Sequence, residues 1–141
     1  MAEPRAEPSE TTLAFMQWLQ QGLAGRAITY NEAGAPVHFV PEGIALVSPL
    51  IFRRYASEAG LAGADAALKV QAELLRAGWH RVQQLPQGHG RSNIARYEVI
   101  GRGGKVTARL AAVVLAEADR WVQPLPPPNP VLRLVAQTTQ A

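Results

Sequence analysis

The feature that most constrains the fold is a pair of β-rich runs, at residues 94–100 and 106–115, joined by only five residues. Apolar and polar residues alternate in the first run, which is the pattern of a half-buried strand. The connector Gly101-Arg102-Gly103-Gly104-Lys105 contains three glycines, the residue type that adopts a positive φ most readily. We therefore predict a β-hairpin whose tip carries two positive charges.

Helical patterns occupy much of the chain before this hairpin. Ser9 is expected to cap a helix that extends to about residue 23, because apolar residues recur there at three- and four-residue spacing. Ser48 is the expected cap of a second helix at 49–59, and Asp65 that of a third, which runs to Ala77 and ends at Gly78. The apolar residues expected to face the core include Leu50, Leu68, Trp79 and Val82.

Turn-forming residues and prolines define the remaining segments. Residues 37–40 and 44–47 are predicted strands of another hairpin, around Pro41-Glu42-Gly43, and residues 83–93 are predicted to be a loop. The prolines of 124–130 lack the donor that regular structure needs, so we expect an extended strap there. A short edge strand is expected at 131–135.

The order of these elements indicates the fold class. Helix, hairpin, two helices and a second hairpin with a basic tip is the order of a winged-helix domain, a variant of the helix-turn-helix. We expect an α+β winged-helix domain with an extra N-terminal β-hairpin at residues 9–122. A disordered lead would precede it at 1–8, and a proline-rich strap and tail would follow at 123–141.

Length and composition limit the class of protein. The 141 residues, of which 48% are hydrophobic, suit one compact domain. No run of 18 uncharged apolar residues and no secretory signal pattern is present, so we expect a cytoplasmic chain with no membrane contact. Cysteine is absent from the sequence, which excludes disulfides, thiol catalysis and thiolate metal sites.

Positive charge is concentrated in the middle of the chain. Residues 49–109 carry ten Lys and Arg against four Asp and Glu, whereas residues 1–48 carry two against five. Eight of the ten cations are arginines, whose planar fork suits phosphate and guanine edges. A polyanionic partner is one explanation, and an ordinary solvated surface is the other.

Catalytic and cofactor motifs do not emerge from the sequence. None of the three histidines, His38, His80 and His89, belongs to a nucleophile triad or to a pair with metal-ligand spacing. His38 is interpreted as a structural residue of a strand and His80 as a helix-end residue, while His89 lies in a glycine-flanked loop where it could contact phosphate. We expect neither an enzyme nor a bound cofactor or metal.

Three runs carry a family resemblance. They are Phe15-Met16-Gln17-Trp18-Leu19, Tyr30-Asn31-Glu32-Ala33-Gly34 and Val40-Pro41-Glu42-Gly43, to which Asn93-Ile94-Ala95-Arg96-Tyr97 and the strap add similarity. Together they resemble the C-terminal domain of MobH-type conjugative relaxases, the TraI-like nickase/helicase proteins of integrative conjugative elements. The resemblance extends from about residue 12 to 135. It implies a winged-helix-like module of a larger relaxase whose metal-dependent chemistry belongs to an upstream HD-type domain, so no catalytic residue is transferred to this chain.

DNA binding is the first functional hypothesis. Transfer-origin DNA would be contacted by the third helix and the basic hairpin, through Lys69, Arg76, Arg91, Arg96, Arg102 and Lys105. One continuous positive face joining these elements would favour this hypothesis.

Protein docking is the alternative hypothesis, because the face of a helix with mixed charge suits either use. The partner would be the parent relaxase or another conjugation protein. The docking surface would comprise the glutamine face of the first helix, the first hairpin and the strap, with Gln17, Gln20 and Gln21 as its test positions. Cations scattered over the surface would favour this hypothesis.

Overall fold

The computed structural model of the chain describes residues 7–84 and 90–135. Three helices form one layer: α1 (Glu10–Ala24), α2 (Leu50–Glu58) and α3 (Ala66–Ala77). The predicted cap of α1 is confirmed, since the Ser9 hydroxyl accepts a hydrogen bond from the Thr12 amide at 3.2 Å. Gly78 ends α3 at a φ of 76°, as expected, whereas Asp65 makes no side-chain capping bond. The capping residue of α2 is Pro49, not Ser48.

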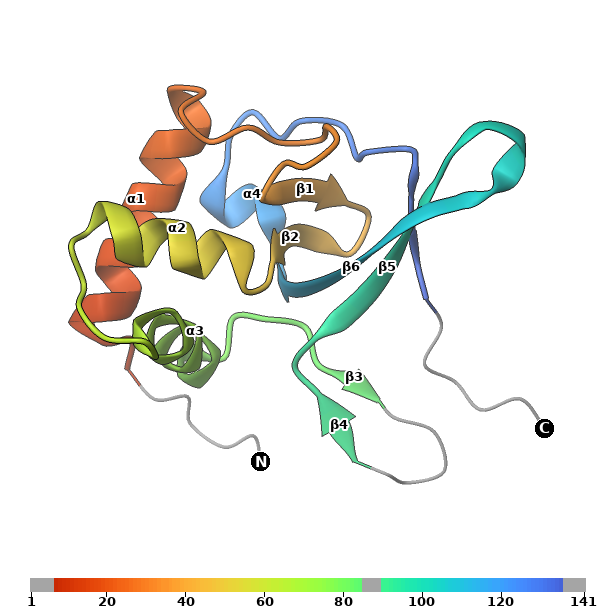
Figure 1. Cartoon of the computed structure of the whole chain (residues 1–141). Helices are drawn as coiled ribbons and strands as arrows, with labels where there is room; N and C mark the ends of the chain where they lie inside the picture. The colour runs from red at the N-terminus through yellow and green to blue at the C-terminus, as the bar shows by residue number, and fades with distance from the viewer. Residues whose placement is uncertain (1–6, 85–89, 136–141) are drawn as a thin grey trace.

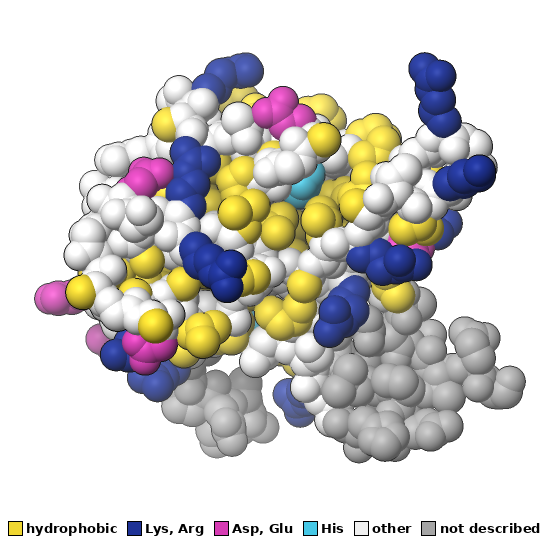
Figure 2. Space-filling model, in the orientation of Figure 1, with side chains coloured by type: hydrophobic (Ala, Val, Ile, Leu, Met, Phe, Trp, Pro, Cys, Tyr) yellow, Lys and Arg dark blue, Asp and Glu magenta, His cyan; other side chains and the backbone are white. Residues whose placement is uncertain are grey.

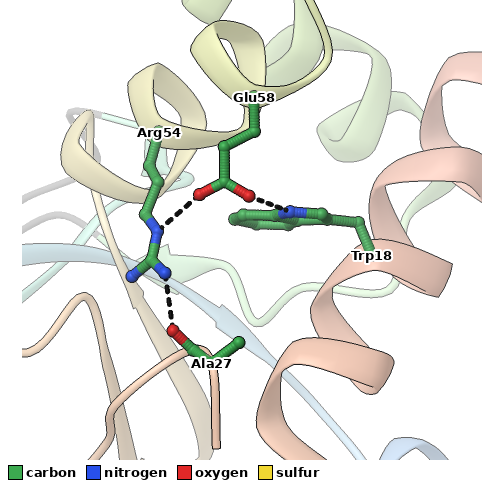
Figure 3. A network of polar contacts seen from close by, with 4 residues as sticks. All are labelled: Trp18, Ala27, Arg54 and Glu58. Atoms are coloured by element: carbon green, nitrogen blue, oxygen red, sulfur yellow. Dashed lines mark hydrogen bonds and ion pairs between the residues drawn. The ribbon is translucent and has the colours of Figure 1, made fainter. Parts of the chain in front are cut away.

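A polar network joins α1, the segment after it and α2 (Figure 3). The indole Nε1 of Trp18 donates to Glu58 at 3.0 Å, and Arg54 donates to Glu58 at 2.9 Å and to the Ala27 carbonyl at 2.6 Å. The hydrogen bond from Trp18, followed by that from Arg54, lowers the pKa of the Glu58 carboxyl below its usual value. Two charged side chains of α2 are therefore engaged within the domain.

Beside the helices lies a curled antiparallel sheet of five strands in the order β1-β2-β6-β5-β7 (Figure 1). The strands are β1 (Val37–Val40), β2 (Gly43–Val47), β5 (Ala95–Ile100), β6 (Val106–Leu115) and β7 (Leu132–Leu134). A separate two-stranded sheet pairs β3 (Gln83–Gln84) with β4 (Arg91–Ser92). A short 3-10 turn, η2 (Arg102–Gly104), and a four-residue helix, α4 (Ala118–Trp121), complete the fold. Both predicted hairpins and the predicted edge strand are present.

The winged-helix prediction is wrong, and strand pairing is the reason. In that fold the last hairpin would stand beside the helices as a wing, with the first hairpin as an addition. Here β6 pairs with β2 through residues 112–115 and with β5 through 106–112, so both hairpins belong to one sheet. All four β1 residues are buried, and such a hairpin needs cover on both faces. The result is an α+β domain with a five-stranded sheet and helices on one side.

Several local expectations are also wrong. The segment predicted as the loop 83–93 contains the β3–β4 pair, although residues 85–89, and with them His89, lie outside the described residues. Leu50, Leu68 and Val82 are exposed, with 44%, 60% and 40% of their surface accessible. For Leu50 and Leu68, helical periodicity predicts a broad apolar stripe, but the neighbouring elements cover only part of it. Val82 lies between α3 and β3, outside any helix.

Two hydrophobic clusters lie on opposite faces of the sheet. The larger one packs β1, β2 and the end of β6 against the helices and includes Phe15, Phe52, Val113 and Leu115. The smaller one lies on the concave face and consists of Val40, Ala45, Ala95, Tyr97, Ala112, Val114 and Leu132. The Tyr97 hydroxyl donates to Glu42 at 2.8 Å, which ties the tip of the first hairpin to β5. Burial, and then this carboxylate, raise the pKa of Tyr97.

The strap, residues 123–130, closes the free edge of β1. The Asn31 side-chain amide donates to the Pro127 carbonyl at 2.9 Å, and the Asn129 amide N–H donates to the Phe39 carbonyl at 2.8 Å. The Asn129 side chain, itself buried, bonds the Nδ1 atom of His38 at 3.2 Å and accepts from the Val131 amide. His38 is thus a structural residue, as expected, and Asn129 holds the strap against the sheet.

Asn129→Ala should lower the free energy of unfolding by about 2 kcal/mol, because it leaves the buried imidazole of His38 and the partly buried amide of Val131 without a partner. Urea unfolding followed by circular dichroism measures this change. The control is Gln21→Ala on an exposed helix position, which should change stability by less than about 0.5 kcal/mol. Equal effects of the two variants would contradict the role assigned to Asn129.

The His38 contact should make stability depend on pH. Burial lowers the pKa of His38 below 6.5, and this effect outweighs the hydrogen bond to Ala35. Below pH 6.5 His38 is therefore protonated in the unfolded chain but still neutral in the folded chain. Its contribution to the free energy of unfolding is complete above this pH and is lost as the pH falls toward the pKa of His38 in the folded chain.

Urea midpoints measured across this pH range should fall more steeply for the wild type than for His38→Asn, which keeps a polar group but does not titrate. Parallel curves would show that another group is responsible.

Candidate nucleic-acid interface

The most prominent projection of the described structure is the outer part of the β5–β6 hairpin, residues 96–111, which we call the arm. It extends away from the helices, with η2 at its tip (Figure 1). Gly103 and Gly104 have φ angles of 72° and 77°, a region that favours glycine, so the tight turn requires these residues. The turn leaves Arg102 and Lys105 exposed at the tip, as the sequence predicts.

Strand register places four charged side chains on one side of the arm and of β7. Glu98 lies opposite Arg109 on β6 and opposite Arg133 on β7, and Arg96 lies opposite Ala111. Directly opposed residues of antiparallel strands share a face. We call the surface formed by Arg96, Glu98, Arg109 and Arg133 the basic face. Farther along β6 the same side is covered by the helices, at Val113 and Leu115.

The carboxylate of Glu98 is shared unequally between two arginines. It accepts from Arg133 at 2.7 Å, whereas the Nε atom of Arg109 lies 3.8 Å away. The Glu98 side chain is 20% exposed, while those of Arg109 and Arg133 are 75% and 63% exposed. Among the described residues, Arg96 has no carboxylate within ion-pair distance. The basic face therefore carries excess positive charge that is open to solvent.

The structure brings together only some of the predicted contacts. Arg96, Arg102 and Lys105 share the arm, and Arg91 lies on β4, before β5. Lys69 and Arg76 lie on α3, at the other end of the molecule, within 3.7 Å of Asp65 and 3.5 Å of Glu73 (Figure 1). In Figure 2 dark-blue side chains lie along the arm, and others lie near α3, over α2 and at the top left of the view. A single continuous face joining the third helix and the hairpin is not what the structure presents.

Two arginines of the basic face were missed by the sequence reasoning. Arg109 could have been found, because strict alternation within 106–115 places it on the same side of the strand as Ala111. Ala111 is the residue that lies opposite Arg96 in the hairpin. Arg133 could not, since its position depends on the pairing of β7 with β5, two segments far apart in the chain.

The surfaces expected for protein docking are partly used within the domain. Gln20 donates to the Trp121 carbonyl at 2.8 Å, and the strap is bonded to β1 as described above. Gln17 and Gln21 remain exposed. The other end of the strap, the turn at Asn31–Ala35 and the arm line an apolar groove of about 390 Å³ on the concave side, with exposed Leu50 and Val131 at its rim (Figure 2).

Other kinds of site find little support in the part of the chain that the structure describes. His80 bonds Asn93 at 2.8 Å through its Nε2 atom and lies beside β6. Within residues 7–84 and 90–135, no group of three or more His, Asp or Glu side chains is placed to hold a metal ion. Over the same residues, no helix has the length and apolar character needed to cross a membrane.

Comparison with known proteins relates the chain to one family. Residues 10–134 match the family model described as "Putative conjugal transfer nickase/helicase TraI C-term". The fold is similar to the crystal structure of the C-terminal domain of Salmonella enterica protein STY4665, a DUF1528 domain. The TM-score is 0.69 at 20% identity, and the match covers 92% of this chain and 100% of the other. No curated protein sequence matches the chain significantly.

Proposed function

Because this chain belongs to the family of C-terminal domains of conjugal transfer nickase/helicases, we propose that it is a non-catalytic DNA-binding domain. It holds transfer-origin DNA through the basic face and the tip of the arm. The observation that carries this proposal is the gathering of three arginines, Arg96, Arg109 and Arg133, with a single carboxylate on one face. The arm that carries Arg96 and Arg109 also carries Arg102 and Lys105 at its tip. The two cations of α3 are left out of the contact surface.

The chemistry of the surface favours binding to phosphates over reading of bases. Guanidinium groups form paired hydrogen bonds with phosphate oxygens, and such contacts supply most of the sequence-independent affinity for DNA. None of the tryptophan, tyrosine or phenylalanine side chains in the described segments belongs to the basic face, so base stacking of the kind used by single-strand binders has no platform there. The domain would therefore hold DNA for the parent protein chiefly through the phosphate backbone.

Removing charge from the arm should weaken DNA binding and lower its salt dependence. The variant Arg102→Ala/Lys105→Ala loses two tip cations, so the slope of log affinity against log salt should fall by about two. Fluorescence anisotropy with labelled duplex and single-stranded DNA over a salt series measures the slope.

The matched control is Lys69→Ala/Arg76→Ala, which removes the same charge from α3 and should reduce the slope less. An absence of binding at low salt, or equal slopes for both variants, would refute the proposed interface.

Protein docking is a second candidate function, favoured by the apolar groove with Leu50 and Val131 exposed at its rim. The partner would be the rest of the nickase/helicase or another transfer protein. Exposed apolar side chains around a concave surface are typical of interaction sites.

A charge in the groove should separate this function from DNA binding. We expect Val131→Asp to lose affinity for the purified remainder of the parent protein while its DNA affinity is unchanged. Leu125→Asp, at an equally exposed strap position that does not line the groove, is the control. Isothermal titration calorimetry measures both, and identical partner affinities for the two variants would count against the groove.

A further inference from the structure

The basic face is not flat, because it contains a recess between Arg96 and Arg109. The recess has a volume of about 310 Å³, and the residues of the basic side that line it are Arg96, Glu98, Arg109, Ala111 and Val135. Its two cations come from neighbouring strands, β5 and β6. A recess of this kind differs from a scattering of surface charges, since it can hold a ligand between the two guanidinium groups.

Strand register explains why the space exists. Arg96 lies opposite Ala111, and Arg109 lies opposite Glu98, so the two arginines are diagonal neighbours on one face. Diagonal neighbours of an antiparallel pair are about 7–8 Å apart, within reach of long side chains. Ala111 contributes only a methyl group between them. The Val135 amide donates to the Arg96 carbonyl at 2.8 Å, and this bond holds the residue after β7 beside the recess.

The charges of the recess are arranged for an anion. The carboxylate of Glu98 makes its short contact with Arg133, on the side away from β6, and its contact with Arg109 is 1.1 Å longer, at 3.8 Å against 2.7 Å. The ion pair with Arg133 therefore counters the negative charge of Glu98, which would otherwise repel an anion. Arg96, the second arginine of the recess, is exposed and has no ion-pair partner among the described residues.

We infer that this recess is a phosphate subsite, in which Arg96 and Arg109 bind one phosphodiester of the DNA backbone. Glu98 is a positioning residue that acts through Arg133 and Arg109 and does not touch the anion. The inference rests on the proposed function for the source of the ligand, DNA. The recess itself would accept any phosphate group. Inorganic phosphate and a DNA phosphate share the chemistry that two guanidinium groups recognise.

Two titrations of the full chain, followed by amide NMR spectra, distinguish these sources. Inorganic phosphate should shift the resonances of Arg96, Arg109 and Ala111 in a saturable way, and a short oligonucleotide should shift the same resonances together with those of the tip. Phosphate shifts that are confined to Arg102 and Lys105, or that never saturate, would overturn the subsite.

Filling the recess tests it without changing charge. Ala111→Leu should abolish the phosphate shifts and lower the salt slope of DNA binding by about one, as expected for one lost contact. Ala14→Leu adds the same volume to an exposed position of α1, outside the arm and the groove, and should leave both measurements unchanged. If Ala111→Leu does not fold, Arg96→Ala/Arg109→Ala provides the same test by removing the ligands.

The outcomes separate the subsite from the proposed function. DNA binding that is unaffected in Ala111→Leu and in Arg96→Ala/Arg109→Ala would overturn the subsite and leave the tip as the DNA contact. Saturable phosphate binding in the recess, together with no DNA binding by the wild type, would support the anion site and refute the proposed function.

Discussion

The pairing of β6 with two different strands is the interaction on which the rest of the structure depends. Residues 112–115 of β6 hydrogen-bond with β2, and residues 106–112 with β5. Because successive side chains alternate, Val113 and Leu115 pack beneath the helices while Ala112 and Val114 contribute to the concave cluster. One strand of ten residues thus connects both hydrophobic clusters. It also carries the arm beyond the helices, where its charged side chains meet solvent.

The same alternation links the core to the proposed interface. The side of β6 that buries Val113 and Leu115 is the side that presents Arg109 to solvent, and the register with β5 then determines which charges meet. Glu98 opposes an arginine on each neighbouring strand, so the charge pattern of the basic face follows directly from strand pairing. A shift of one residue would turn these side chains toward the concave cluster, where burial of charge is costly.

Local sequence signals predict the elements well but predict their assembly poorly. The cap at Ser9, the helix end at Gly78 and the glycine-rich tip each depend on the conformational preferences of a few neighbouring residues, and all three are present. The winged-helix arrangement failed because the pairing of β2 with β6 joins segments about 70 residues apart, for which no local pattern exists. The site behaves in the same way. Arg96, Arg102 and Lys105 follow from the hairpin alone, whereas Arg133 becomes part of the basic face only through the return of β7.

The central claim is that DNA meets the arm and not the third helix. Mapping amide NMR shifts on addition of a short DNA duplex tests it most directly, because the arm and α3 lie at opposite ends of the molecule and report separately. The account predicts that the perturbed resonances belong to residues 96–111 and 132–135, with α3 unchanged. Perturbations centred on α3, with the arm unaffected, would contradict it.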